Sequence, residues 1–147
     1  MIPICLVTGF LGSGKTTFLR HLVERLAQRR IIYLVNELSE VDVDGALLSE
    51  MEDDVVAIAG GSIFCRCLAS EFIAQLSTLP ERFGSFDGVV IEASGIADPR
   101  VMQQLLVETG LEQVYALSSI VTVVDPGTFP RLLHTLDKVR AQVEAAD

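Results

Sequence analysis

Residues 9–16 read GFLGSGKT, which matches the phosphate-binding loop pattern G-x-x-x-x-G-K-[ST]. The glycines of such a loop let successive backbone N–H groups face one concavity that holds phosphate oxygens. Lys15 supplies a cation for the β- and γ-phosphates, and Thr16 supplies a hydroxyl for Mg²⁺. The motif therefore predicts a site for the phosphates of a nucleotide. The loop residues expected to form it are Gly9, Gly12, Ser13, Gly14, Lys15, Thr16 and Thr17.

The sequence on either side of this loop has the context that the motif requires. Residues 4–8 form a short apolar run, which predicts a buried strand. Residues 16–29 are predicted to form a helix, because apolar residues recur on one face at helical spacing. The N-terminus of that helix would add a partial positive charge at the phosphates.

The rest of the chain alternates between further strands and helices. Continuous apolar runs, typical of strands covered on both faces, lie at residues 31–35, 55–58, 88–91 and 120–124. The helices predicted between and after them span residues 46–51, 70–78, 100–108 and 128–145. This order predicts a doubly wound α/β fold of three layers, with a mostly parallel sheet and helices on both faces. Ligands of such folds bind beyond the carboxyl ends of the strands.

A second motif is expected to complete the phosphate site. Residues 89–95 read VVIEASG, an apolar strand that ends in Glu92 and is followed by Gly95. The carboxylate can hold Mg²⁺ through a water molecule or orient the attacking water, and the Gly95 N–H can contact the γ-phosphate. Asp125, which follows the last predicted strand, is a rival for the same role. We favour Glu92 because of Gly95, and Lys15 and Glu92 are thus the predicted catalytic residues.

Composition limits the partners of the protein. The 147 residues carry a formal net charge of −9, half are hydrophobic and 21% are charged. These values predict one domain with a sizeable core, and the acidic balance argues against nucleic acid and anionic membrane surfaces as partners. No apolar run approaches a membrane span, and three cysteines do not make a disulfide framework. We therefore expect a cytoplasmic protein.

Several segments resemble the CobW family of P-loop GTPases, which is related to the nickel-delivery GTPases of urease and hydrogenase maturation. Residues 8–17, TGFLGSGKTT, resemble the opening of that family. Residues 36–40, NELSE, resemble its Asn-Glu-Phe-Gly switch I segment, although Leu38-Ser39 replaces Phe-Gly. Residues 92–99, EASGIADP, resemble its Glu-x-x-Gly-x-Ala-Asp-Pro switch II segment. The resemblance runs over the whole chain.

The resemblance implies that the nucleotide is GTP or GDP and that the protein is a GTP-hydrolysing switch. Such a switch would help to deliver a transition metal, such as zinc or cobalt, to a client metalloprotein or an enzyme of cobalamin-type cofactor synthesis. Mg²⁺ would be held by Thr16 and Glu92. We expect slow turnover, because the sequence shows no glutamine or arginine finger that would speed hydrolysis.

The chain departs from the family at its metal motif. The family carries Cys-x-Cys-Cys where this chain reads SIFC at residues 62–65, followed by Arg66-Cys67. Cys65 and Cys67 could still bind a soft metal as thiolates, with Glu37 as a further ligand. Two thiolates do not close a tetrahedral site, so the alternative is a pair of ordinary reduced thiols.

The chain also lacks the motif that normally reads guanine, Asn-Lys-x-Asp, since Asn36 is its only asparagine. The resemblance places the strand leading to that motif just beyond Asp147. We therefore expect residues 1–147 to form an incomplete GTP-binding domain with weak base selectivity. The sheet edge beside residues 120–124 should then be open and apolar, which favours self-association.

Two other functions fit the same motifs. The chain could be a nucleotide- and metal-binding module without significant hydrolysis. It could also be a P-loop kinase of a small acceptor, although only Arg82 and Arg100 lie near plausible lid loops. Phosphate release from GTP without an acceptor favours the GTPase, and stimulation by an acceptor favours the kinase.

Overall fold

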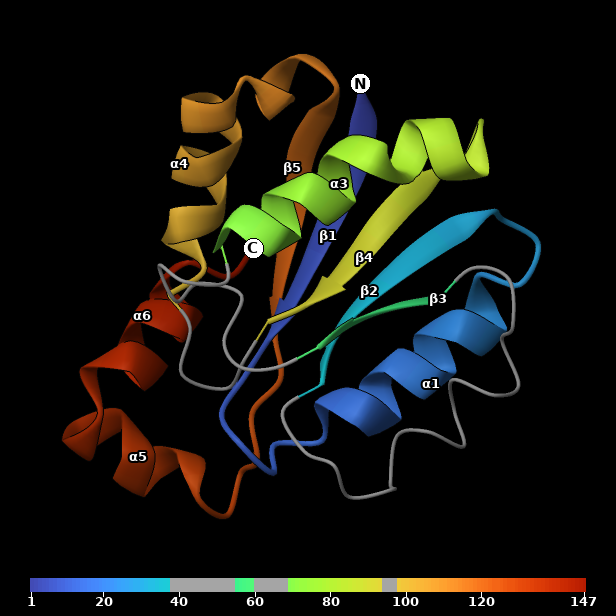
Figure 1. The fold of residues 1–147 in the computed structure, drawn as a ribbon. Coiled ribbons are helices and arrows are strands. Elements are labelled where there is room, and N and C mark those ends of the chain that lie inside the picture. Colours follow the sequence, from blue (N-terminus) through green and yellow to red (C-terminus); the bar gives the residue numbers. More distant parts are fainter. Residues whose placement is uncertain (38–54, 60–68, 94–97) are drawn as a thin grey trace.

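The computed structural model describes residues 1–37, 55–59, 69–93 and 98–147 (Figure 1). Its strands form one sheet in the order β3-β2-β4-β1-β5, and every pairing is parallel. This arrangement confirms the predicted doubly wound α/β class. The strands are β1 (Ile2–Thr8), β2 (Ile31–Glu37), β3 (Val55–Ala59), β4 (Gly88–Glu92) and β5 (Tyr115–Thr122). The helices are α1 (Lys15–Arg25), α3 (Ala69–Phe83), α4 (Arg100–Thr109), α5 (Phe129–Thr135) and α6 (Asp137–Glu144), with a 3₁₀ turn η1 (Leu111–Gln113).

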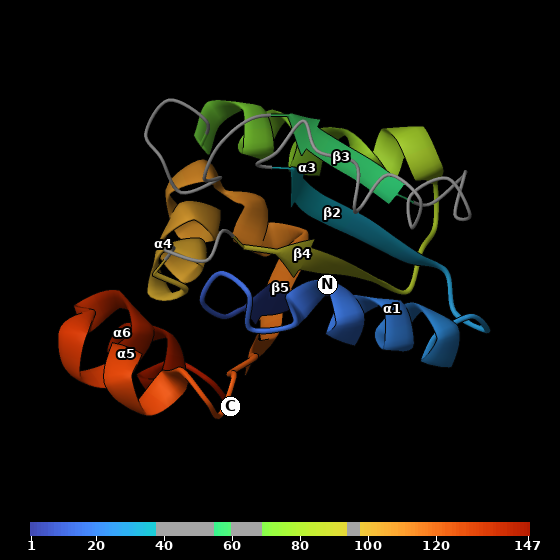
Figure 2. The same cartoon turned by 90° about the horizontal axis from the view of Figure 1, so that it is seen from below.

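Helices cover both faces of the sheet, as the sequence predicts. Successive residues of a strand point to opposite faces, so Ile4 and Leu6 of β1 pack in the cluster that includes α3 and α4. Val7 points to the opposite face and packs with Leu19 of α1. Figure 2 shows α1 on one side of the sheet and α3 on the other. The helix predicted at residues 46–51 lies outside the described residues.

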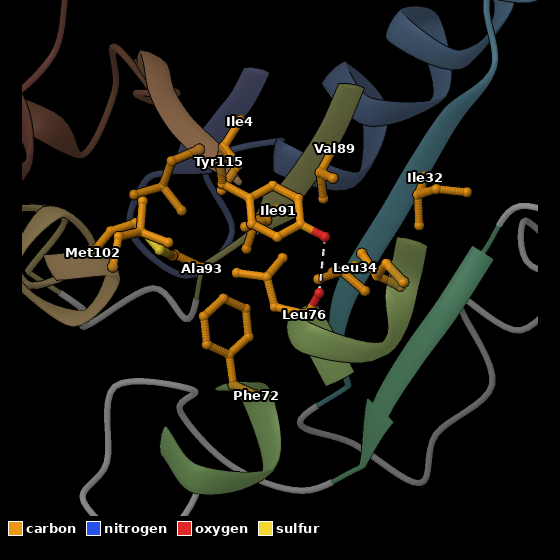
Figure 3. Packing of buried hydrophobic residues seen from close by; sticks show 13 residues of the cluster. Ile4, Ile32, Leu34, Phe72, Leu76, Val89, Ile91, Ala93, Met102 and Tyr115 are labelled. Atoms are coloured by element: carbon orange, nitrogen blue, oxygen red, sulfur yellow. Dashed lines mark hydrogen bonds between the residues drawn. The ribbon is translucent and has the colours of Figure 1, made fainter. Parts of the chain in front are cut away.

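A buried tyrosine completes the hydrogen bonding of α3. Pro80 lies inside this helix and has no N–H to donate to the carbonyl of Leu76, one turn earlier. The hydroxyl of Tyr115, which is 1% exposed, donates to that carbonyl at 2.8 Å (Figure 3). Tyr115 thus ties the start of β5 to the middle of α3, 39 residues away in the chain.

We expect Tyr115→Phe to lower the free energy of unfolding by about 1–3 kcal/mol, because it leaves a buried carbonyl unpaired. The loss should shrink in a Pro80→Ala background, where residue 80 regains an N–H that can reach the Leu76 carbonyl. Urea titrations of the four proteins measure both effects.

The pH dependence of stability provides a second readout of the same bond. Burial raises the pKa of Tyr115 to about 12, above its value of roughly 10 in an unfolded chain. The stabilisation is therefore present below pH ~10 and lost as the pH rises towards the folded value. Tyr115→Phe should remove this alkaline loss, and an equal loss in both proteins would contradict the assignment.

The last strand begins five residues earlier than predicted, at Tyr115 rather than at residue 120. The register between β1 and β5 shifts between Ile4 and Cys5, which pair with Leu117 and Ser119. Ser118 is therefore the extra residue of a bulge, and it is exposed. Two consecutive serines interrupt the apolar pattern at this bulge. The pattern therefore did not predict the first half of the strand.

The helix predicted over residues 128–145 is instead two helices, α5 and α6. Leu136 lies between them with an extended backbone, φ −129° and ψ 106°. Its side chain is 38% exposed. The break allows α6 to bury Val139, Ala141 and Gln142, so packing overrides local helical propensity. Helix α1 also ends early, at Arg25 rather than residue 29.

Candidate functional site

The phosphate-binding loop joins the end of β1 to the start of α1, as the motif requires. A side chain at Gly9 would collide with the carbonyl oxygen of Val123 and would lie 2.8 Å from Ser13 Oγ. Gly14 has φ 98°, a left-handed conformation that favours glycine, and it is the N-cap of α1. Both glycines are therefore required by the path of the backbone.

Lys15 is buried within this loop although it carries a charge. Its ammonium donates to the carbonyl of Gly9 at 2.9 Å and to that of Phe10 at 3.3 Å. An ammonium has three donors, so these two carbonyls hold the group in place and leave a donor for a phosphate oxygen. Burial lowers the pKa of Lys15, and the negative charge of Glu92 partly opposes that shift.

The N-terminus of α1 suits an anion. Its first turn contains no acidic residue and no side-chain cap, so its backbone N–H groups and partial positive charge remain available to phosphates. Thr16 is half-buried and Thr17 is exposed in this turn. The N–H of Ser13 donates to the carbonyl of Phe10 at 3.1 Å.

Glu92 lies at the carboxyl end of β4, next to β1. It pairs in register with Val7, two residues before Gly9. It is half-buried, and its charge acts on Lys15. A carboxylate and the Thr16 hydroxyl are oxygen donors of the kind that Mg²⁺ prefers. The donor set therefore fits Mg²⁺, whereas Gly95 lies outside the described residues.

Asp125, the rival of Glu92, is engaged in the turn that begins α5. Its carboxylate accepts hydrogen bonds from the Thr128 hydroxyl at 2.7 Å and from the N–H groups of Gly127 and Thr128, both at 3.2 Å. The Thr128 hydroxyl in particular lowers the pKa of Asp125. These bonds give Asp125 a structural role in the turn that begins α5.

Helix α4 begins at Arg100, directly after residues 92–99, the segment that resembles switch II. The guanidinium of Arg100 contacts the carboxylate of Asp98 at 2.7 Å, and the Arg100 N–H donates to the same carboxylate at 3.0 Å. These bonds lower the pKa of Asp98. Asp98 thus fixes the first turn of α4 from a partly exposed position.

Most of the predicted transition-metal site falls outside the part of the chain that the structure describes. Cys65 and Cys67 lie outside it, and Glu37 is the last residue of β2. Among the described residues, no group of three or more His, Cys, Asp or Glu side chains could hold a metal ion. Over the same residues, no helix has the length and apolar character needed to cross a membrane.

Two polar residues near the loop are buried, which the sequence pattern did not predict. Thr8 is fully buried at the end of β1, and Gln142 of α6 is 1% exposed. The Thr122 hydroxyl donates to the backbone carbonyl of Gln142 at 2.7 Å, which holds α6 against β5. A threonine that directly precedes the first glycine of the loop is the one signal in the sequence that pointed to Thr8.

Comparisons with known proteins place this chain among relatives of established families. The chain is 34% identical to a zinc chaperone CobW of Pseudomonas aeruginosa, over 96% of this chain and 41% of that protein. It is 33% identical to a zinc-regulated GTPase metalloprotein activator 1 of Schizosaccharomyces pombe, over 84% of this chain and 32% of the relative. The crystal structure of Zn(II)-bound YjiA GTPase from Escherichia coli matches with a TM-score of 0.66 and 27% identity, over 99% of this chain and 47% of that one.

The chain thus spans less than half the length of each of these relatives. Residues 3–147 match the nucleotide-binding domain described as CobW/HypB/UreG. That match extends over nearly all of the chain and includes the loop, β4 and the turn after β5. The protein belongs to the CobW/HypB/UreG family of nucleotide-binding domains.

Proposed function

We propose that residues 1–147 form a nucleotide-binding domain that acts as a Mg²⁺-dependent switch in the cytoplasm, binding GTP and hydrolysing it slowly. One observation carries this proposal. A buried ammonium, Lys15, is held by loop carbonyls at the N-terminus of α1, and the negative charge of Glu92 at the end of β4 acts on it. Relatives named as GTPases support the choice of GTP.

In this proposal each residue has a separate role in hydrolysis. The loop N–H groups and Lys15 bind the phosphates and neutralise charge as the terminal phosphate leaves. Thr16 and, through water, Glu92 would hold Mg²⁺, which when bound supplies charge neutralisation at the β- and γ-phosphates. Glu92 can also orient the attacking water, and the Gly95 N–H would contact the γ-phosphate.

Delivery of a metal to a client protein is the second part of the proposal. Relatives of this chain are named zinc chaperones, which favours zinc over cobalt as the cargo. Cys65, Cys67 and Glu37 are the proposed ligands for that cargo, because thiolates select soft metals. The proposed client is a metalloprotein or an enzyme that builds a metal-containing cofactor.

We expect the 147-residue chain to prefer GTP over ATP by less than about tenfold, roughly 1.4 kcal/mol. An Asn-Lys-x-Asp motif would discriminate strongly, because the wrong base leaves buried polar groups unpaired, and this chain has no such motif. The phosphate contacts do not depend on the base. Competition between GDP and ADP measures the selectivity directly.

The competition between GDP and ADP can be run beside a measurement of self-association of the chain. β5 lies at one edge of the sheet. The N–H and the carbonyl of Ile120 are already bonded to Asp147, so the edge is not open at this residue as the sequence led us to expect, and association would use the other residues of β5. We expect light scattering to show association that increases with protein concentration. A preference for GDP of about a hundredfold in a strict monomer would mean that other residues read guanine.

A further inference from the structure

A cavity of about 160 Å³ lies on the side of the sheet that carries α1 (Figure 2), at the opposite end of β1 from the phosphate loop. It is lined by the first residues of β1 and β4, by the bulge of β5 and by the turn that follows α1. Leu26, Ile31 and Val90 give it apolar walls. A cavity of about 150 Å³ with apolar walls holds one benzene molecule, so this cavity has room for a ligand of that size.

Small residues on three neighbouring strands create this space. Cys5 of β1 pairs in register with Val90 of β4 and with Ser119 of β5, so the three side chains share one face. Gly88 lies two residues before Val90 and has no side chain on that face. Helix α1 packs on the same face but ends at Arg25, so no further turn of helix fills the space. The cavity therefore follows from the small residues of the strands and from the early end of α1.

The mouth of the cavity carries a cation without a partner. Arg29 is exposed in the turn after α1, and its guanidinium makes no hydrogen bond or ion pair with any described residue. Arg30, by contrast, donates from its guanidinium to the Ser85 carbonyl and from its N–H to the Asp87 carboxylate, both at 2.9 Å. Asp87, the acid at the same mouth, thus already has a donor. The free guanidinium favours a ligand with a carboxylate, whose two oxygens fit the planar fork of an arginine.

We propose that this cavity binds a small carboxylic acid, with its apolar body in the cavity and its carboxylate on Arg29. The body is about the size of one benzene ring. An apolar pocket with a polar group that fixes the orientation of the ligand is the usual design of a small-molecule site. The site is separate from the proposed GTPase function, because none of the residues assigned to phosphate or Mg²⁺ lines this cavity.

Benzoate is the probe for this site, because it combines a ring of the right size with a carboxylate. A ligand this small should bind the parent with a Kd of about 1 mM, and the amide NMR signals of Cys5, Gly88 and Ser119 should shift as it binds. Benzyl alcohol keeps the ring and lacks the charge, so it should bind about fivefold more weakly. Arg29→Ala should weaken benzoate binding to the level of benzyl alcohol, and should leave benzyl alcohol within about twofold of the parent.

Two further variants test the location of the site. Arg20 is exposed on α1 and does not line the cavity, so Arg20→Ala is the matched control and should bind benzoate as the parent does. Ser119 is half-buried on the edge strand, and Ser119→Leu extends a side chain into the cavity. That variant should weaken the binding of both probes at least about fivefold.

Three results would overturn the proposal. Benzylamine that binds more tightly than benzoate would mean that Asp87, rather than Arg29, selects the ligand. Loss of benzoate binding in Lys15→Ala would place the carboxylate at the phosphate loop. Benzoate affinity that falls as the protein concentration rises would mean that a second copy of the chain covers the cavity. Arg29→Ala should bind a GTP analogue as the parent does, so this site and the proposed function can fail separately.

Discussion

Lys15→Ala is expected to leave a folded protein whose affinity for a labelled GTP analogue has fallen at least a hundredfold, roughly 2.7 kcal/mol. The ammonium is the fixed cation of the loop, held at 2.9 Å from the Gly9 carbonyl. Its removal deletes a charge-assisted bond to phosphate. The fold should survive, because burial of that charge disfavours the ammonium in the empty protein.

Lys138, the other lysine of the chain, provides the control for this prediction. It lies exposed on α6, so Lys138→Ala should bind the analogue as the parent does. Circular dichroism and thermal melting verify that both variants are folded. Equal binding by the Lys15→Ala protein and the parent would mean that the phosphates do not bind at this loop.

Glu92→Gln is expected to slow GTP hydrolysis about a hundredfold or more while changing nucleotide affinity much less. The substitution keeps the size of the side chain and removes the charge that acts on Lys15 and would hold Mg²⁺ through water. Single-turnover phosphate release, measured beside equilibrium binding, separates the two effects. Binding and hydrolysis that fall together would indicate a structural role for Glu92.

Asp125→Asn is the matched comparison for Glu92→Gln. Its carboxylate is bonded to Thr128 and Gly127 within its own turn, so we expect this variant to lose stability more than activity. Loss of hydrolysis in the Asp125→Asn protein alone would show that the acid at the end of β5, rather than that of β4, serves the reaction.

The phosphate loop and the fold class could be predicted from sequence because their signals are local. Residues 9–16 contain every side chain and glycine that the loop needs, between a strand and a helix whose patterns are clear. Continuous apolar strands alternating with amphipathic helices are sufficient to predict a parallel sheet. The position of Glu92 next to β1 follows once the order of the strands is known.

The features that the sequence did not predict depend on contacts between distant segments. The bulge at Ser118 arises from pairing with β1, more than a hundred residues earlier. The hydroxyl of Tyr115 is needed by the Leu76 carbonyl only because Pro80 stands one turn later in α3. The break at Leu136 follows from the packing of Val139 and Gln142, which no helical periodicity encodes.

Release of inorganic phosphate from GTP, with Mg²⁺ present and no acceptor added, tests the proposed switch most directly. Slow, repeated turnover by the parent that disappears in Lys15→Ala and falls sharply in Glu92→Gln is the predicted result. A parent that binds GTP without releasing phosphate, or that transfers phosphate only when a small-molecule acceptor is added, would contradict the proposal.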